Sequence, residues 1–397
     1  MSKVLIFNYR KLANTGGPEG YLYNIYTHLQ SNPADQIVFY SDLLDQSVDV
    51  THPKHQKKNL YKTLVNDVKQ VINLCWRIYN RKGPTPPVGF EVNDYDFVHV
   101  HKINDFFTFK NRFPQYKGKV ILTSHCPCPW TDEMLSHYDR FVAFFRPIIL
   151  YWECKAFKNA DYIMFPCKGA REPYEKERRI KEVFVNNEDK FFYVPSAITD
   201  VNIDEESMQK FADIGIPEES FVISYFGRHN SIKGYDVIKK VGAELLDKHP
   251  NLYFVCAGRG EIEPLNHPRW IELGFIGNTH ELLYQSDLYI SANRETYFDL
   301  IVLEILRSGT KLILSETGGN NFFKNYPVSE KSGLEFFDIS DFNTLLNLVE
   351  NNIVKKNNMH NVFAAECAAN RTLFLAHFTM DKYVSNYISS IKKLVTG

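Results

Sequence analysis

The sequence predicts an α/β protein with two doubly wound domains that face a central cleft. Three observations predict this fold. The chain has 397 residues, which is enough for two or three domains. Short apolar runs alternate with longer amphipathic stretches, as is typical of a parallel sheet with helices on both faces. The alternation stops in the polar, acidic stretch 199–217 and then begins again, so domains are expected at 1–200 and 201–377.

The first domain is expected to repeat strand and helix in turn. The apolar runs that predict strands lie at 4–7, 37–40, 97–101, 120–124, 162–165 and 191–194. The amphipathic stretches that predict helices lie at 20–29, 60–78, 133–156 and 170–183.

The second domain repeats this pattern. Strands are expected at 221–226, 252–257, 270–273, 288–291 and 311–315, and helices at 232–246, 280–285 and 300–308. In doubly wound sheets, ligands bind beyond the carboxyl ends of the strands. Functional residues are therefore expected directly after each strand.

Charge and cysteine usage argue against several classes of function. The formal net charge is −1, so no overall basic field favours nucleic acid. The seven cysteines have no spacing typical of a secreted disulfide framework. Cys126 and Cys128 lack a second pair at the spacing of a zinc site, so no metal site is expected.

No targeting or membrane-spanning segment is expected. The apolar run 4–7 is too short for a signal peptide. The most apolar stretch, 141–152, contains Arg146 and Pro147 and is shorter than the roughly 20 residues that span a bilayer. The cytoplasm is therefore the expected compartment. A buried amphipathic helix is the favoured interpretation of this stretch, and contact with a membrane surface is the alternative.

The segment after the strand 221–226 is the most informative part of the chain. Gly227 allows a close turn, and Arg228 and Lys233 flank the start of the next helix. A helix N-terminus favours anions, and two cations strengthen that preference. Arg can bind two phosphate oxygens at once, whereas Lys acts as a mobile point charge. A diphosphate site and an ordinary solvated loop both remain open from this segment alone.

A second segment follows the strand 288–291. A helix is expected to begin near Phe298, so the backbone N–H groups of Phe298, Asp299 and Leu300 would point to a phosphate or a sugar hydroxyl. Glu304 lies one turn further along, where a carboxylate can accept hydrogen bonds from both hydroxyls of a ribose. A solvated helix position is the alternative for Glu304.

Two features of the first domain are weaker signals. Gly16 and Gly17 lie in a glycine-rich turn between a strand and a helix, without the spacing of the dinucleotide-binding motif. His125 directly follows the strand 120–124 and is therefore expected at the carboxyl edge of the sheet. A structural and a functional role for His125 both remain open.

These residues together resemble family 4 of the retaining glycosyltransferases, which have the GT-B fold of two Rossmann-like domains. The resemblance extends along nearly the whole chain. The similar motifs are Gly16-Gly17, the strand 96–101 (Asp-Phe-Val-His-Val-His), Thr123-Ser124-His125, Phe226-Gly227-Arg228 with Lys233-Gly234, the turn 274–277 with Ile276, and the final helix beginning near Phe378.

The resemblance implies a metal-independent hexosyltransferase that moves a sugar, with retention, from a nucleotide-diphosphate donor such as a UDP-sugar. The acceptor would be a glycan, a lipid-linked molecule or a protein, in bacterial surface polysaccharide or glycoconjugate synthesis. The domain 201–377 would bind the donor, and the domain 1–200 the acceptor. The helix 378–397 would cross back to the first domain. His125 would lie beside the donor sugar, and Ile276 beside the base. Work at the inner face of the membrane would fit a lipid-linked acceptor. The oligomeric state is left open.

The sequence departs from the family pattern at the donor site. Family members usually carry two glutamates with glycines around a phenylalanine between them. Here Thr296 stands at the first glutamate position and Asp299 at a glycine position, while Glu295 lies one residue early. Two alternatives therefore remain: a weak or inactive glycan-binding subunit, and a sugar-nucleotide epimerase. The Asp94-Tyr95-Asp96 segment resembles a metal-binding DxD motif, but it precedes its strand, so a structural role at the start of the strand is expected.

Overall fold

The structure is a computed structural model that describes residues 2–10, 12, 17–44, 60–136, 144–206, 208, 210–277 and 279–396. Contacts divide the chain into two compact units. The first comprises Met1–Pro166, Arg171–Val194 and Val384–Gly397, and the second comprises Cys167–Ala170 and Pro195–Tyr383. Each unit is described by itself below.

The first unit contains one six-stranded sheet in the order β2-β1-β3-β4-β5-β6, in which every pair of neighbours is parallel. Its strands are β1 (Val4–Ile6), β2 (Ile37–Phe39), β3 (Phe97–Val100), β4 (Lys119–Leu122), β5 (Tyr162–Phe165) and β6 (Phe191–Tyr193). Its helices are α1 (Gly17–Ser31), α2 (Leu60–Asn80), α3 (Ile103–Arg112), α4 (Trp130–Ser136), α5 (Arg146–Asn159), α6 (Glu172–Glu175) and α7 (Arg178–Val185).

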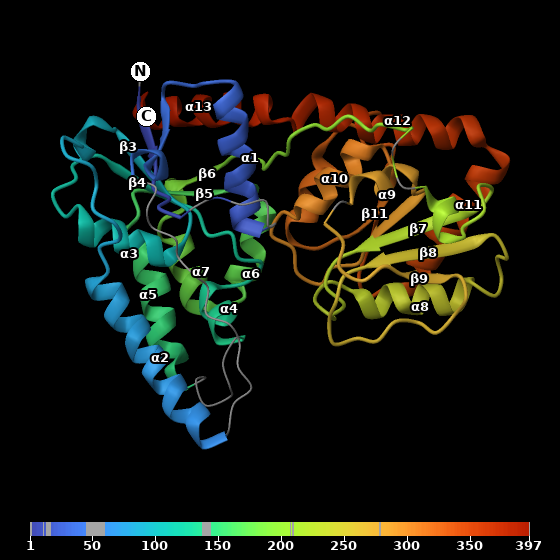
Figure 1. Cartoon of the computed structure of the whole chain (residues 1–397), viewed down its shortest axis with the longest axis horizontal. Coiled ribbons are helices and arrows are strands. Elements are labelled where there is room, and N and C mark those ends of the chain that lie inside the picture. The colour runs from blue at the N-terminus through green and yellow to red at the C-terminus, as the bar shows by residue number, and fades with distance from the viewer. Residues whose placement is uncertain are drawn as a thin grey trace. The chain divides into compact units, whose positions relative to one another are not determined.

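Helices cover both faces of the first sheet. Figure 1 shows α1 and the end of α13 (Met380–Thr396) on one side, with α2, α3 and α5 on the other. Strand β3 is buried along its whole length, and β5 is buried except at Tyr162, as expected for a parallel sheet between two helical layers. The predicted helix 133–156 corresponds to α4 and α5, and Pro147 lies in the first turn of α5. Residues 137–143 lie outside the described ranges.

The start of β3 explains the Asp94-Tyr95-Asp96 segment. Asp96 accepts a hydrogen bond from the backbone N–H of Lys3 at 2.8 Å, at the amino end of the strand. The carboxylate therefore joins β3 to the start of β1, which is the structural role expected from the sequence.

The second unit also contains one six-stranded parallel sheet, in the order β12-β11-β10-β7-β8-β9. Its strands are β7 (Phe221–Phe226), β8 (Leu252–Ala257), β9 (Trp270–Glu272), β10 (Leu288–Ser291), β11 (Lys311–Ser315) and β12 (Leu334–Phe337). Its helices are α8 (Tyr235–Leu245), α9 (His280–Gln285), α10 (Leu300–Ser308), α11 (Phe342–Asn358), α12 (His360–His377) and the start of α13.

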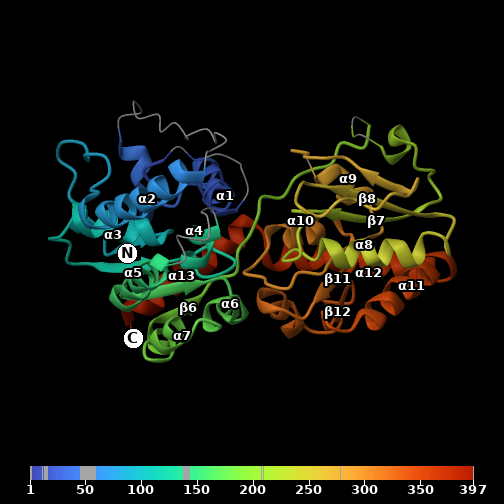
Figure 2. The ribbon, with the colours of Figure 1, turned by 90° about the horizontal axis from the view of Figure 1, so that it is seen from below.

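This sheet is also covered on both faces. Residues of α8 and α11 pack with β7, β8 and β10 in one buried apolar cluster. On the other side α10 contacts both α9 and α12. Figures 1 and 2 show α8 lying along β7 and β8. Strands β7 and β10 are neighbours, so the loops at their carboxyl ends meet.

A buried ion pair attaches α12 to this sheet. The side chain of Lys311 is fully buried in β11, and its Nζ lies 2.8 Å from Oε2 of Glu366 in α12. Lys355 of α11 binds the other oxygen of Glu366 at 2.9 Å and is 22% exposed. Among the described residues, Glu366 is therefore the only ion-pair partner of Lys311, a lysine that water does not reach.

We expect Glu366→Gln to lower the free energy of unfolding of the second unit by roughly 3 kcal/mol, because the buried Lys311 charge loses its counterion. Urea unfolding measures the change. Lys355→Met is the matched control and should have a smaller effect, since Lys311 keeps its partner. A Glu366→Gln variant as stable as the Lys355→Met variant would contradict this account.

Candidate functional site

The loop between β7 and α8 holds Arg228 and Lys233 by their main chain. The Tyr225 hydroxyl lies 2.8 Å from the Arg228 carbonyl oxygen and 3.3 Å from that of Lys233. Oδ1 of Asn230 accepts from the Lys233 N–H at 2.9 Å. The two cations are therefore fixed relative to one another at the carboxyl end of the strand. Tyr225 and Asn230 were not predicted, because a tyrosine inside a strand gives no sequence signal for this contact.

Two glycines allow this loop to lie close to its neighbours. Gly234 has a φ of 69°, and a Cβ atom there would lie 2.0 Å from the carbonyl oxygen of Ala292. Gly258 has a φ of 141°, and a Cβ atom there would lie 1.8 Å from the carbonyl oxygen of Gly227. Both positions need glycine, for conformation and for space. The first contact brings Lys233 to the end of β10.

The two cations differ in their partners. Nζ of Lys233 lies 2.7 Å from Oδ2 of Asp299, and the two side chains are 26% and 15% exposed. The side-chain amide of Asn293 donates to the same carboxylate oxygen. Arg228 is exposed, and its guanidinium has no ionic partner among the described residues. Asn293 was also missed, although it lies just after β10, where functional residues are expected.

Helix α10 begins at Leu300, as the predicted helix 300–308 requires, and two residues after the start near Phe298 that the second segment indicated. Asp299 is its N-cap residue, in an extended conformation, but its side chain accepts no hydrogen bond from the first turn. The first N–H groups of a helix have no acceptor within the helix. The start of α10 therefore presents donors next to Lys233, as an anion site requires. Phe298 is buried just before the helix, and Leu300 is half-buried.

Glu304 lies further along α10 and is half-buried. Its Oε2 accepts a hydrogen bond from the Thr279 hydroxyl at 2.8 Å. Ile276 is half-buried in the turn before Thr279, and Gly274 in the same turn has a φ of 67°. Glu304 is therefore held to Thr279, while its contact with a ribose and that of Ile276 with a base stay predictions. Thr279 was not predicted.

The side chain of Thr296 is turned into the protein. It is fully buried, and its hydroxyl donates to the Thr317 carbonyl at 2.6 Å. A Cβ atom at Gly318 would lie 2.2 Å from the Thr296 carbonyl oxygen, and one at Gly319 would lie 1.9 Å from that of Tyr297. Thr296 thus fastens the segment before α10 to the segment after β11. Its contact with a donor stays a prediction.

In the first unit, His125 lies in a cluster of histidines beyond β3 and β4. Nδ1 of His101 lies 2.9 Å from Nε2 of His125, and the Tyr21 ring lies 4.7 Å from the His125 ring. His99 contacts the Tyr387 hydroxyl at 2.9 Å through Nδ1 and the Thr123 hydroxyl at 2.8 Å through Nε2. Gly17 begins α1, and Gly16 lies outside the described residues.

Burial keeps these histidines neutral. It lowers the pKa of His125 to about 3 and holds the pKa values of His99 and His101 well below their usual range. Nε2 of His101 is buried without a hydrogen-bond partner. Since a buried N–H without an acceptor is rare, the favoured tautomer of His101 carries its proton on Nδ1 and donates it to Nε2 of His125. His125 then carries its own proton on Nδ1.

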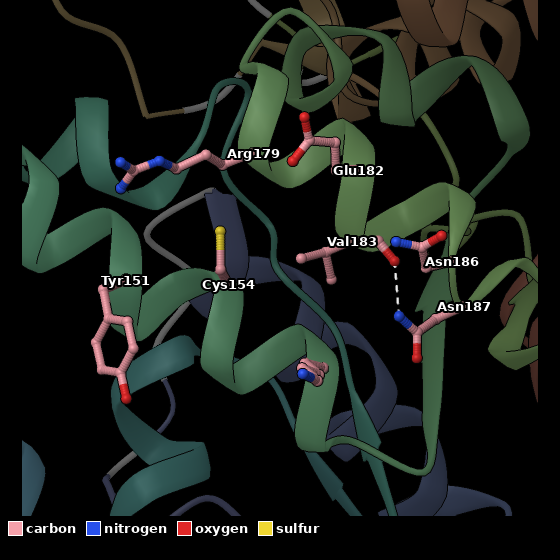
Figure 3. A pocket seen from close by; sticks show the side chains of 8 residues that line it. Tyr151, Cys154, Arg179, Glu182, Val183, Asn186 and Asn187 are labelled. Atoms are coloured by element: carbon pink, nitrogen blue, oxygen red, sulfur yellow. Dashed lines mark hydrogen bonds between the residues drawn. The ribbon is translucent and has the colours of Figure 1, made fainter.

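A groove between α5 and α7 of the first unit lies apart from these predicted residues. It is lined by Tyr151, Cys154 and Lys158 of α5 and by residues of α7 that include Arg179 and Val183 (Figure 3).

Among the residues that the structure describes, no group of three or more His, Cys, Asp or Glu side chains is arranged to hold a metal ion. No described helix combines the length and apolar character needed to cross a bilayer.

Comparisons with known proteins agree with the fold. Residues 220–334 match the family described as glycosyl transferases group 1. No curated protein matches the chain by sequence. Sucrose-phosphate synthase from Thermosynechococcus elongatus is similar over 100% of both chains, with a TM-score of 0.62 and 14% identity. Anabaena Alr3699/HepE, solved with UDP, is similar over 98% of this chain and 100% of its own, with a TM-score of 0.62 and 12% identity.

A glycosyltransferase from Rickettsia africae is similar over 99% of both chains, with a TM-score of 0.61 and 14% identity. At such identities the likeness establishes the fold. The predicted GT-B fold, with a doubly wound parallel sheet in each of two units, is therefore confirmed.

We expect the first unit to lose stability as the pH falls below about 6.5, the ordinary pKa of histidine. There the unfolded chain binds protons that the neutral, buried histidines of the folded state do not. Each such histidine should lower the free energy of unfolding by roughly 1.4 kcal/mol between pH 7.5 and pH 5.5. Urea unfolding at both pH values measures the loss. His125→Asn should show a smaller loss than the wild type, and an equal loss would contradict the assignment.

Proposed function

Because residues 220–334 form a group 1 glycosyl transferase domain within a GT-B fold, we propose that the chain is a retaining glycosyltransferase with a nucleotide-diphosphate sugar as donor. One observation carries the proposal. The loop after β7 holds the main chain of Arg228 and Lys233, Gly234 brings this loop to the end of β10, and Lys233 pairs with Asp299 at the start of α10. Two cations and a helix N-terminus form a site for a diphosphate.

These groups stabilise the leaving group. Departure of the nucleotide places negative charge on the distal phosphate, and the cations and the N–H groups at the start of α10 oppose that charge. The acceptor hydroxyl attacks on the face from which the nucleotide leaves, and the donor phosphate takes its proton. No side-chain nucleophile is assigned. A catalytic role is also proposed for neutral His125, which would donate through Nδ1.

Uridine is the proposed base. Anabaena Alr3699/HepE, which has the same fold, has been solved with UDP-glucose. In this chain Glu304 accepts a hydrogen bond from Thr279, three residues after Ile276, and the two positions are proposed to bind the ribose and the base. The transferred sugar is proposed to be a hexose.

The reaction is proposed to need no divalent metal, because Arg228 and Lys233 supply the positive charge that a metal would otherwise provide. Binding of the donor by positive side chains also fits the short distance from Lys233 to the start of α10.

We expect Arg228→Ala and Lys233→Ala each to lower turnover of a UDP-sugar by about 100-fold, because each removes a charge that stabilises the leaving phosphate. Lys248→Ala is the control, since this lysine is exposed on the same unit and pairs only with Glu244 among the described residues. Turnover is measured as UDP release with a panel of glycan acceptors, in excess EDTA. Near-normal turnover in both variants would disprove the diphosphate assignment, and loss of wild-type turnover in EDTA would disprove metal independence.

The first unit carries an exposed apolar face, and this face is the basis for the proposed kind of acceptor. Helix α5 buries Ile149 and Leu150 but exposes Ile148 and Tyr151, and Phe144 just before the helix is also exposed. The helix is thus amphipathic, as expected, with one buried face and one exposed apolar face. The side chains of Ile72 and Trp76 of α2 are 59% and 62% exposed. The α2 and α5 helices touch, with 4.7 Å between the ring centroids of Tyr79 and Trp152.

Cations border this face. Nζ of Lys155 lies 4.7 Å from the ring centroid of Trp152 and 5.7 Å from that of Tyr151. Lys158 and Arg179 line the adjacent groove shown in Figure 3. Aromatic side chains next to cations suit the interface of an anionic membrane. The chain is therefore proposed to use a lipid-linked acceptor at the inner face of the membrane, in bacterial glycoconjugate synthesis.

We expect the protein to sediment with vesicles that contain an anionic lipid and not with neutral vesicles. The double variant Trp76→Ser and Ile148→Ser should remain in the supernatant, because it loses apolar contact with the bilayer. The exposed Val328→Ser in the second unit is the control. Equal sedimentation of the double variant and the control would disprove the membrane face and leave the donor site untouched.

Experiments can distinguish two other functions from the proposed transferase. The burial of Thr296 in place of the usual glutamate favours an inactive glycan-binding subunit, which would bind UDP without turnover of any acceptor. A sugar-nucleotide epimerase would alter UDP-N-acetylglucosamine with no acceptor present. Product analysis after incubation with this donor alone separates the epimerase from the transferase.

A further inference from the structure

The carboxylate of Asp299 occupies the part of the site where we propose that the diphosphate binds. Its Oδ2 lies 2.7 Å from Nζ of Lys233 and also accepts from the side-chain amide of Asn293. The side chain is only 15% exposed. Lys233, which is proposed to bind phosphate, is thus already paired with the carboxylate of Asp299.

The position of Asp299 makes this pairing notable. An aspartate at a helix N-cap usually accepts from an N–H group of the first turn. Asp299 is the N-cap of α10, yet its side chain makes no such bond and turns to Lys233. A negative charge therefore lies beside both elements that attract the diphosphate, the lysine and the start of α10.

A diphosphate at Lys233 and the Asp299 carboxylate would both be negative, and like charges this close repel one another. A diphosphate that approaches Lys233 must either replace the Asp299 carboxylate as its partner or lie next to that carboxylate. Arg228 has no ionic partner among the described residues, so it remains available for the first contact. Of the two cations, only Lys233 has a carboxylate partner with which the diphosphate would compete.

We propose that Asp299 is an affinity-lowering residue that competes with the diphosphate for Lys233. This inference rests on the proposed donor site and deepens it. The competition weakens the binding of the donor and also of the nucleotide product. When UDP leaves, the carboxylate pairs again with Lys233, which favours release of the product.

A second role for the same contact has the opposite consequence. If Asp299 instead positioned the Lys233 ammonium for the phosphate, loss of the carboxylate would weaken nucleotide binding. The sign of the change in affinity separates competition from positioning.

The variants Asp299→Asn and Asp299→Gly test the proposal. Asp299 has a φ of −71° and a ψ of 123°, which both residues adopt, and Asn is also a good N-cap residue. Asp236→Asn is the matched control, because Asp236 lies in the first turn of α8 and pairs with Arg294 at 2.7 Å, not with Lys233. It removes one negative charge from the same unit without changing the contested contact.

We expect titration calorimetry to show that both Asp299 variants bind UDP about tenfold more tightly than the wild type, the size of one charge-assisted contact. The control should stay within about twofold of the wild type. Thermal unfolding gives a second readout, because tighter binding raises the shift in Tm that a fixed UDP concentration produces.

Each outcome decides the matter. Unchanged or weaker UDP binding by both Asp299 variants, with a wild type that binds UDP, would overturn the competition and leave the proposed function standing. A gain in Asp236→Asn as large as in Asp299→Asn would show a general charge effect and would also overturn it. Failure of UDP to bind the wild type and every variant would overturn the proposed function itself, and the inference with it.

Discussion

The proposed donor site depends on a close backbone contact between two neighbouring strand ends. Strands β7 and β10 are parallel neighbours, so their following loops begin at the same edge of the sheet. Gly234 has no side chain to hold these loops apart, and the main chain at this glycine can lie against the Ala292 carbonyl. Through this contact, side chains far apart in the sequence share one anion-binding region. The remaining features of the region, including the partners of Lys233 and the start of α10, follow from that approach.

Much of the fold could be predicted because buried parallel strands are continuous apolar runs. Strand β12 was missed because it is a short run interrupted by Glu335, and α3 because its cluster of phenylalanines gave no clear helical period. The apolar run 300–308 predicted α10 at its observed bounds, whereas the start near Phe298 was two residues early, since the extended conformation of Asp299 is decided by its contacts and not by helix propensity. Local pattern thus predicts which elements exist better than where they begin.

The residues of the candidate site could be predicted to about the same extent as the elements of the fold. The rule that ligands bind after strands singled out Arg228, Lys233 and Glu304, and it placed His125 at the correct edge. The rule could not predict which side chains pair with them. The contacts of Tyr225 with the loop, of Thr279 with Glu304 and of His101 with His125 join positions whose spacing in the sequence carries no signal. Such contacts depend on the tertiary packing of the loops.

The burial of Thr296 has a consequence for how this site can change in evolution. The residue is enclosed, its hydroxyl serves the Thr317 carbonyl, and Gly318 lies against its backbone. A glutamate at this position would bring a longer, charged side chain into a space closed by carbonyl groups. A single substitution of Thr296 by glutamate is therefore not accommodated by this packing. The segment from Thr317 to Asn320 would have to be remodelled first, because a charge buried among carbonyl groups is costly.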